Sequence, residues 1–149
     1  MKLQVRDIVS HAGRDWVVEG ILTYKLGNRT LPLARVADGS AVRFVEPLLD
    51  DLDDRVLMMA EVDDLDTETP PPQTISYQGK SYVPRFSGAA TVALEGRVPG
   101  RSTGACELWR YRAAGDVFLQ IERWPDRVVV LAGESIHKGM IDVLPGSGT

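Results

Sequence analysis

Two glutamates close otherwise apolar stretches of the chain. Glu46 ends residues 42–46 and Glu122 ends residues 118–122. Two carboxylates that share one pocket can act as general acid and general base, so a small-molecule-binding barrel or a hydrolase-like enzyme is one reading of this pair. In the other reading, each carboxylate pairs with an arginine of the neighbouring strand, Arg55 or Arg127, and stabilises a hairpin. The structural role is the expected one, and the catalytic pair is the alternative.

Aromatic residues and arginines are interleaved in a second region. The six residues are Trp109, Arg110, Tyr111, Arg112, Arg123 and Trp124. In a strand, Trp109 and Tyr111 would share one face and the two arginines beside them the other. Such a mixture is typical of protein-binding surfaces and also of surfaces that stack single-stranded bases. The structural reading, a buried aromatic face backed by solvated arginines, is the expected one, and the binding surface is the functional alternative.

No other residue type stands at a spacing that points to chemistry. His11 and His137 have no second ligand at metal spacing, and residues 133–137 (GESIH) lack the glycine that a nucleophile elbow needs. Cys106 is expected to be a small buried side chain. We therefore expect no metal, no cofactor and no catalytic residue, which favours a non-catalytic binding or scaffolding module with a protein partner.

Charge is distributed unevenly along the chain. The net charge is −4, and the acidic excess lies between Glu46 and Glu68, where Arg55 is the only base. Three prolines follow, so residues 63–73 are predicted to be a linker between an N-terminal unit, 1–62, and a C-terminal unit, 74–149. The acidic stretch 50–68 could attract a cation such as a polyamine, although a solvated acidic linker is the expected role. Without a basic excess, nucleic acid is not an expected partner.

Composition places the chain among ordinary globular proteins, with 44% hydrophobic and 26% charged residues. A single cysteine cannot form an internal disulfide, which fits a reducing compartment. The charged start has no signal-peptide core, and no apolar run is long enough to span a membrane. We expect a cytoplasmic protein that does not insert into a membrane. The oligomeric state stays open.

Two parts of the sequence are similar. Residues 10–17 (SHAGRDWV) match residues 76–83 (SYQGKSYV), and residues 54–60 (DRVLMMA) match residues 126–132 (DRVVVLA). The second copy carries extra residues at 96–104. These matches predict a duplicated unit, while the alternative is that β-proteins reuse the same turn chemistry.

Alternation with a period of two runs through residues 16–24 and 82–94, which predicts strands. Gly20 and Gly88 are expected to mark bends. The expected fold is all-β, with two pseudo-repeated antiparallel units of about five strands each. The units would form two small barrels or one rolled sheet. Helix is nearly absent, and a single turn at 135–139 is the one candidate.

The second half resembles a bacterial domain family of unknown function, number 4178 in its series. The likeness lies in residues 77–82 (YQGKSY), 109–111 (WRY), 119–124 (LQIERW) and 132–136 (AGESI), with a weaker likeness at 13–20 (GRDWVVEG). Residues 31–34 (LPLA) depart from a Trp-Glu-Glu-Tyr-like strand of that family. The resemblance implies no assigned activity. Family genes often lie beside polyamine-synthase-like and small membrane proteins, which implies an accessory role in a membrane, envelope-stress or polyamine-related system.

Overall fold

The structure, a computed structural model, describes residues 2–47 and 54–146. The strands are β1 (Ile8–His11), β2 (Arg14–Leu26), β3 (Arg29–Asp38), β4 (Ala41–Glu46), β5 (Arg55–Glu61), β6 (Ile75–Tyr77), β7 (Lys80–Gly96), β8 (Gly104–Ala113), β9 (Val117–Trp124), β10 (Arg127–His137) and β11 (Ile141–Leu144). The predicted all-β class is confirmed. The single helical turn begins later than predicted, because residues 135–137 still belong to β10 and the 3-10 turn η1 spans Lys138–Met140.

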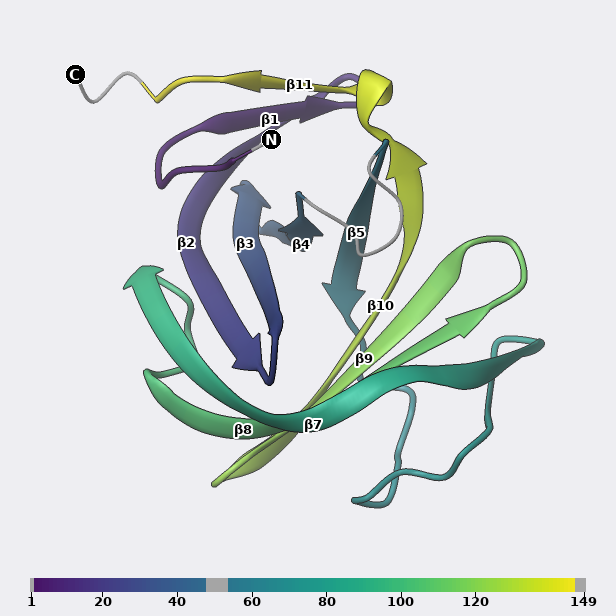
Figure 1. Cartoon of the computed structure of the whole chain (residues 1–149). Coiled ribbons are helices and arrows are strands. Elements are labelled where there is room, and N and C mark those ends of the chain that lie inside the picture. The colour runs from purple at the N-terminus through teal and green to yellow at the C-terminus, as the bar shows by residue number, and fades with distance from the viewer. Residues whose placement is uncertain (1, 48–53, 147–149) are drawn as a thin grey trace.

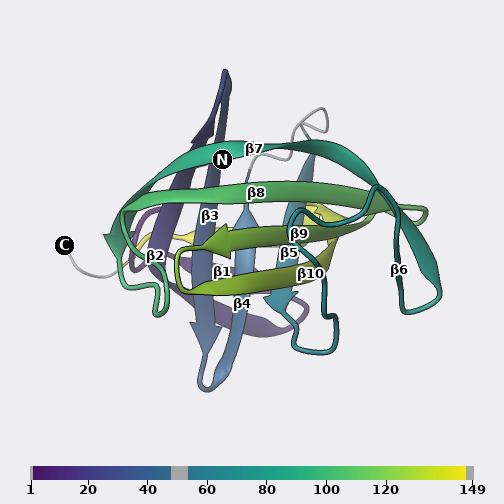
Figure 2. The same ribbon diagram turned by 90° about the horizontal axis from the view of Figure 1, so that it is seen from below.

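Eight strands close into one antiparallel barrel in the order β2-β3-β4-β5-β10-β9-β8-β7, and β7 pairs back with β2 (Figures 1 and 2). Each half of the chain supplies four of these strands. The halves are joined twice, by β5 with β10 and by β2 with β7. Of the two architectures that the sequence left open, the structure is the single rolled sheet, and the hydrogen bonds at both seams explain why neither half stands as a separate barrel.

Both faces of the barrel wall are covered at β9 and at residues 129–131 of β10. On β9, Phe118 and Trp124 point into the barrel core, whereas Leu119 and Ile121 belong to a second apolar cluster outside it. The same holds for residues 129–131 of β10, which alternate between the two clusters. Strands buried on both faces lose the apolar–polar alternation, which is why this run reads as continuously apolar.

The outer covering consists of two flaps. The N-terminal flap is β1, β11 and residues 14–17 of β2, and the C-terminal flap is β6 with residues 80–83 of β7. The N-terminal flap packs Val9 and Trp16 against Val36 and Val45 on the outside of the barrel. In the C-terminal flap, Tyr82 packs with Tyr111 and other side chains outside β8 to β10 in the same way.

The hairpin turns of the two flaps share an unusual backbone. Ala12 and Gly13 have φ of 52° and 78°, and Gln78 and Gly79 have φ of 49° and 76°. Both residues of each turn are left-handed, as the tight two-residue turn of a hairpin requires. The glycine at the second place of each turn is therefore a requirement of the turn.

Only one of the two glycine bends is confirmed. The register of β2 with β3 shifts between Val18 and Gly20, which is a bulge. A Cβ at Gly20 would lie 2.4 Å from the Arg97 carbonyl oxygen, so the loop after β7 can approach only a glycine. Gly88 pairs in regular register with Leu108, and the irregularity of β7 lies between Pro84 and Phe86 instead.

The acidic segment 63–73 lies along the outside of the C-terminal half. Leu65 packs against the outer cluster, Tyr111 donates a hydrogen bond to the Pro72 carbonyl at 2.8 Å, and Tyr77 donates to Asp64 at 2.7 Å. Burial and the Asp64 carboxylate raise the pKa of Tyr77 to about 12. The part of the acidic stretch at 50–53 falls outside the described residues. Within the described chain no helix is long and apolar enough to cross a membrane.

Candidate functional site

Glu46 lies inside the barrel at the end of β4 and is fully buried. Its partner is Arg110 of β8, which donates to the two carboxylate oxygens at 2.8 and 3.3 Å. Arg110 is itself 1% exposed. A guanidinium that meets both oxygens of a carboxylate forms the strongest type of protein ion pair.

Gln120 connects this pair to the second glutamate. Its side-chain oxygen accepts a 3.0 Å hydrogen bond from Arg110 Nε, and its nitrogen donates to Glu122 at 2.8 Å. The two glutamates therefore belong to one polar network that crosses the barrel interior. The alternation of β9 produces this arrangement, because Gln120 and Glu122 share the inward face with Phe118 and Trp124.

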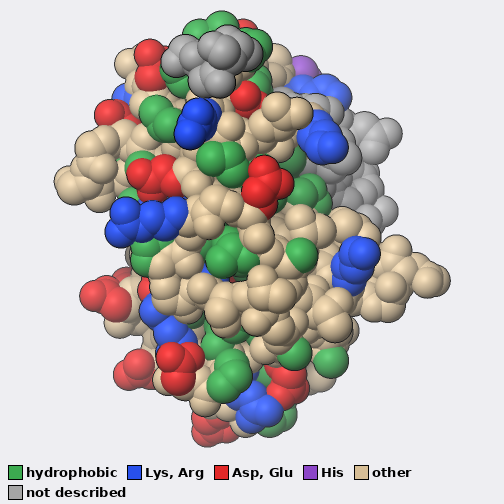
Figure 3. Space-filling view, turned by 90° about the vertical axis from the view of Figure 1, so that its left-hand side faces the viewer, with side chains coloured by type: hydrophobic (Ala, Val, Ile, Leu, Met, Phe, Trp, Pro, Cys, Tyr) green, Lys and Arg blue, Asp and Glu red, His purple; other side chains and the backbone are tan. Residues whose placement is uncertain are grey.

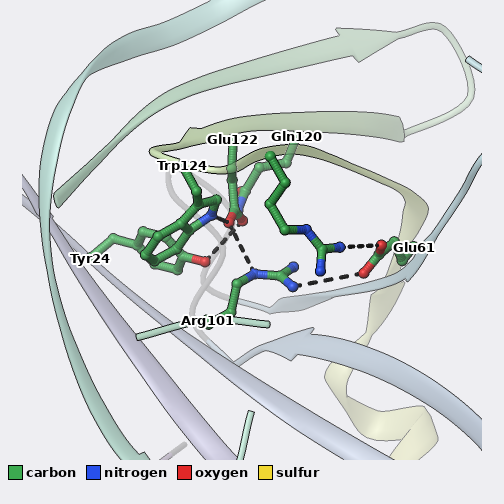
Figure 4. Close-up of polar contacts among 7 residues, drawn as sticks. Tyr24, Glu61, Arg101, Gln120, Glu122 and Trp124 are labelled. Atoms are coloured by element: carbon green, nitrogen blue, oxygen red, sulfur yellow. Dashed lines mark hydrogen bonds and ion pairs between the residues drawn. The ribbon is translucent and has the colours of Figure 1, made fainter. Parts of the chain in front are cut away.

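Glu122 is surrounded by donors (Figure 4). Tyr24 donates to it at 2.8 Å, Trp124 Nε1 at 2.7 Å and Arg101 Nε at 3.3 Å, in addition to Gln120. Burial, and then the nearby Glu122 carboxylate, hold the pKa of Tyr24 well above its ordinary value. Tyr24 therefore remains a hydrogen-bond donor at neutral pH.

The prediction that Arg55 and Arg127 pair with the two glutamates is wrong. Arg55 bonds Ser135, with its Nη2 at 2.9 Å from the Ser135 carbonyl, and Arg127 pairs with Glu61 at 2.9 Å. Sequence reasoning assigned each glutamate to the following strand. In the barrel, however, the inward side chains of β4 and β9 meet those of β8 and of the loop after β7.

The network fits a structural role better than acid–base catalysis. All four carboxylate oxygens of Glu46 and Glu122 accept hydrogen bonds, and neither residue is exposed. A substrate could reach either carboxylate only by displacing one of these donors. Removing a partner from a buried ion pair is costly, so the network holds the barrel together.

The six aromatic and arginine residues do not share one surface. Arg110 and Trp124 lie inside the barrel, and Tyr111 is buried outside it with Trp109 partly buried beside it. The expected solvation of Arg110 is wrong, because Glu46 and Gln120 compensate its burial. Of the others, Arg112 pairs with Asp116 and Arg123 with Glu107.

Arg123 and Trp124 alone come together at a pocket. It has a volume of about 420 Å³, and Cys106 and Glu107 also line it. Burial raises the pKa of the Cys106 thiol to about 12, with a further contribution from Glu122, so the thiol is a poor nucleophile at neutral pH. Cys106 therefore does not make this pocket a nucleophilic site.

A second pocket lies on the outside of the barrel, where β5 pairs with β10, and we call it the seam groove. Its volume is about 410 Å³. The outward side chains Met58, Ala60 and Ala132 contribute to its lining, and Gly133 lies at the same seam. A Cβ at Gly133 would lie 1.9 Å from the Met58 carbonyl oxygen, so the two strands approach each other closely there.

Both flaps border the seam groove. His11, at the end of β1, lies on the side of the N-terminal flap, and Tyr77, Gln78 and Tyr82 lie on the side of the C-terminal flap. Sequence similarity had already paired the regions around His11 and Tyr77. It could not show that the two face the same groove.

Opposite charges flank the floor of the seam groove. Arg43 extends from β4, where its guanidinium lies 5.3 Å from the centroid of the Trp16 ring, and Glu134 extends from β10. Within residues 2–47 and 54–146 neither side chain forms an ion pair. Arg43 Nη1 donates a hydrogen bond to the Val42 carbonyl at 2.8 Å, but no opposite charge in this part of the chain neutralises Arg43 or Glu134.

Metal-ligating side chains and the charge of one face complete the description of possible ligand sites. No group of three or more histidine, cysteine or acidic side chains among the described residues could hold a metal ion. On the face shown in Figure 3, acidic and basic side chains are interspersed, and no large patch of one sign is formed.

Comparison with known proteins identifies the family. A search of curated proteins and a search of solved structures each returned no match. A family model described as Domain of unknown function (DUF4178) matches residues 4–138, which include all eight barrel strands. The chain therefore belongs to the DUF4178 family.

Proposed function

We propose that this protein is a non-catalytic binding module whose seam groove takes a short segment of a partner protein. The observation that carries the proposal is the groove itself, about 410 Å³ in volume, with an apolar floor between two charged side chains that form no ion pair within the described residues. The barrel supplies the support for the groove, because its wall is closed by strand pairing at both seams.

The lining favours a polypeptide. Tyr77, Tyr82, Met58 and Arg43 are of the residue types that are enriched in the cores of protein interfaces. Methionine also adapts to side chains of different shapes. The small side chains of Ala60 and Ala132 leave room for one apolar side chain of the partner.

Charge specifies the partner further. An acidic residue on one side of the apolar side chain would meet Arg43, and a basic residue on the other side would meet Glu134. Such pairs at the rim of an interface contribute specificity and association rate more than affinity. The partner segment is therefore an apolar residue between an acid and a base.

Two broader proposals accompany this one. The matching left-handed turns at Gly13 and Gly79, and the correspondence in order of β1 to β5 with β6 to β10, support descent from a duplicated unit. The single cysteine supports a reducing, cytoplasmic setting. Within a bacterial cell, a groove that takes a protein segment would suit an accessory component of a larger system, such as an envelope-stress or polyamine-related one.

Selection from a random peptide library tests the binding function. Peptides would be selected on the folded protein and their affinities measured by fluorescence polarisation on wild type and on Ala60→Trp, which fills the groove. Val83→Trp is the matched control, because Val83 is 53% exposed and is not among the lining residues of the groove.

The proposal expects selected peptides that carry an apolar residue flanked by an acid and a base. Ala60→Trp should weaken their binding by at least about 10-fold, and Val83→Trp should leave it unchanged. Arg43→Glu with Glu134→Lys should reverse the preferred order of the peptide charges. A library that yields no binders, or binders unaffected by Ala60→Trp, would refute the seam groove as the site.

A further inference from the structure

The cation beside Glu122 comes from a loop, whereas the cation beside Glu46 comes from a barrel strand. Arg101 lies in residues 97–103, which connect β7 to β8. The corresponding connection between β2 and β3 is the tight turn at residues 27–28. Sequence comparison of the two halves had already marked this region as extra residues in the second copy. We call residues 97–103 the plug loop, because Val98 and Arg101 are buried against the barrel.

The two buried arginines are bound very differently. Arg110 meets both oxygens of Glu46, and its other hydrogen bonds go to Gln120. Arg101 meets Glu122 through Nε at 3.3 Å and Glu61 through Nη1 at 3.7 Å. Its Nη2 is buried and has no hydrogen-bond partner among the described residues. The carboxylates around Arg101 are therefore arranged for a cation, but this guanidinium does not fit them fully.

The site around Arg101 is preorganised without it. Tyr24, Gln120 and Trp124 hold the Glu122 carboxylate at 2.7–2.8 Å, and all three come from barrel strands. The Phe44 ring lies 5.4 Å from the Arg101 guanidinium carbon, within the range of a cation–π contact. A fixed carboxylate beside an aromatic face is a site for an organic cation.

Few backbone hydrogen bonds hold the plug loop in place, and its anchors are the buried side chains of Val98 and Arg101. Among its backbone hydrogen bonds, Arg97 donates to the Glu19 carbonyl at 2.9 Å and Arg101 donates to the Val98 carbonyl at 3.1 Å, and the second lies within the loop. Glycines with positive φ stand just before it and inside it, at Gly96 and Gly100. A segment with so few backbone bonds to the rest of the fold opens at a lower free energy than the barrel unfolds.

We propose that the space filled by Arg101 is a binding site for a guanidinium group, and that the plug loop is its internal competitor. When the loop swings out, a guanidinium that is free of the loop backbone can meet Glu122 through two parallel hydrogen bonds, as Arg110 meets Glu46. Glu61 and the Phe44 ring complete the site. This site lies inside the barrel, apart from the seam groove, and does not depend on it.

Calorimetry and thermal unfolding of the full chain test the site with n-butylguanidinium as the probe. n-Butylurea, which is neutral and of similar shape, and n-butylammonium are the matched controls. Hydrogen exchange of residues 97–103 reports whether the loop leaves when the probe binds. A blocked arginine peptide, run in parallel, separates recognition of a peptide side chain from recognition of a free small molecule.

In wild type, the proposal expects butylguanidinium to raise the unfolding temperature and to speed exchange in residues 97–103, whereas butylurea does neither. Arg101→Ala removes the competitor and should bind butylguanidinium at least about 10-fold more tightly. Glu122→Gln should abolish binding, and Arg123→Ala, whose side chain is half-exposed outside the site, should change nothing.

Two results would overturn the proposal. One is that butylguanidinium and butylurea act alike on wild type. The other is that wild type shows no response while Arg101→Ala responds, which would make Arg101 a fixed part of the fold. If Arg101→Ala does not fold, the wild-type titration and its loop exchange decide the matter alone.

Discussion

Glu46 and Arg110 form a two-point ion pair across the barrel interior, at 2.8 and 3.3 Å, with neither side chain more than 1% exposed. The pair joins β4, from the first half of the chain, to β8, from the second. It therefore adds a polar connection between the halves to the two seams of backbone hydrogen bonds. Because the pair is buried, each charge is compensated mainly by the other, and removing one leaves the other without a counter-charge.

Arg110→Met should be strongly destabilising. It leaves the Glu46 carboxylate buried without its counter-charge, which costs about 3–5 kcal/mol. Urea unfolding would measure the loss. Arg123→Ala, which breaks the exposed pair with Glu107, serves as the control and should cost no more than about 1 kcal/mol. Equal effects of the two substitutions would contradict the assigned role of the interior pair.

Gly133→Ala should disturb the β5–β10 seam. The added methyl group would lie 1.9 Å from the Met58 carbonyl oxygen and 2.6 Å from the Met59 Cα, so the backbone must move. We expect the free energy of unfolding to fall by about 1–3 kcal/mol. At Gly88 the nearest atom to the new Cβ would be Leu26 Cδ2, at 3.7 Å, and Gly88→Ala should be close to neutral. If Gly133→Ala were equally neutral, the close approach of the two strands would be disproved.

Because of Tyr24, the free energy of unfolding should decrease as the pH rises into the alkaline range. Its folded-state pKa lies well above 10.0, chiefly because of burial and then because of Glu122. A raised folded-state pKa gives stability that is fully present below the unfolded-state pKa of 10.0 and is lost as the pH rises through the folded-state value.

Tyr24→Phe removes that dependence together with a hydrogen bond to a charged group. At neutral pH the variant should be about 1.5–3 kcal/mol less stable than wild type. The difference should narrow above pH 10, as measured by urea unfolding across the pH range. A difference that stayed constant or widened would contradict the raised pKa of Tyr24.

Cys106 should resist thiol reagents in the folded protein. Burial raises its pKa to about 12, so almost none of it is thiolate near neutral pH. The protein would be treated with a disulfide reagent whose released thiolate is measured by absorbance. We expect slow labelling at about pH 8 in native buffer and rapid labelling in denaturant. Native labelling as fast as in denaturant would contradict the burial of this side chain.

The strands were predictable because their signals are local. The alternation over 16–24 and 82–94 needs only the side-chain period of a strand, and Gly13 and Gly79 mark turns that require a left-handed residue. Closure of the barrel was not predictable, because it depends on the pairing of β2 with β7 and of β5 with β10. Those partners lie far apart in sequence, and no turn connects either pair.

The orientation of Arg110 shows why the interior network was missed. Alternation on β8 correctly separates Trp109 and Tyr111 from Arg110, but it cannot tell which face is inside when both faces are covered. Arginine is rarely buried unless it is paired, so the solvent side was the reasonable expectation. One signal was present in the sequence, since Gln120 and Glu122 lie in phase with Phe118 on a strand that is otherwise apolar. Polar side chains on the same face as a buried phenylalanine require hydrogen-bond partners that are buried as well.

The most direct test of the binding function is an NMR titration of methyl-labelled protein with a library-selected peptide. Methyl signals of Met58, Ala60 and Ala132 should shift as the peptide saturates the protein, while those of Leu22 and Leu33 inside the barrel remain in place. Shifts confined to methyl groups outside the seam groove, or no saturable shift at any of its three methyl-bearing residues, would contradict the account.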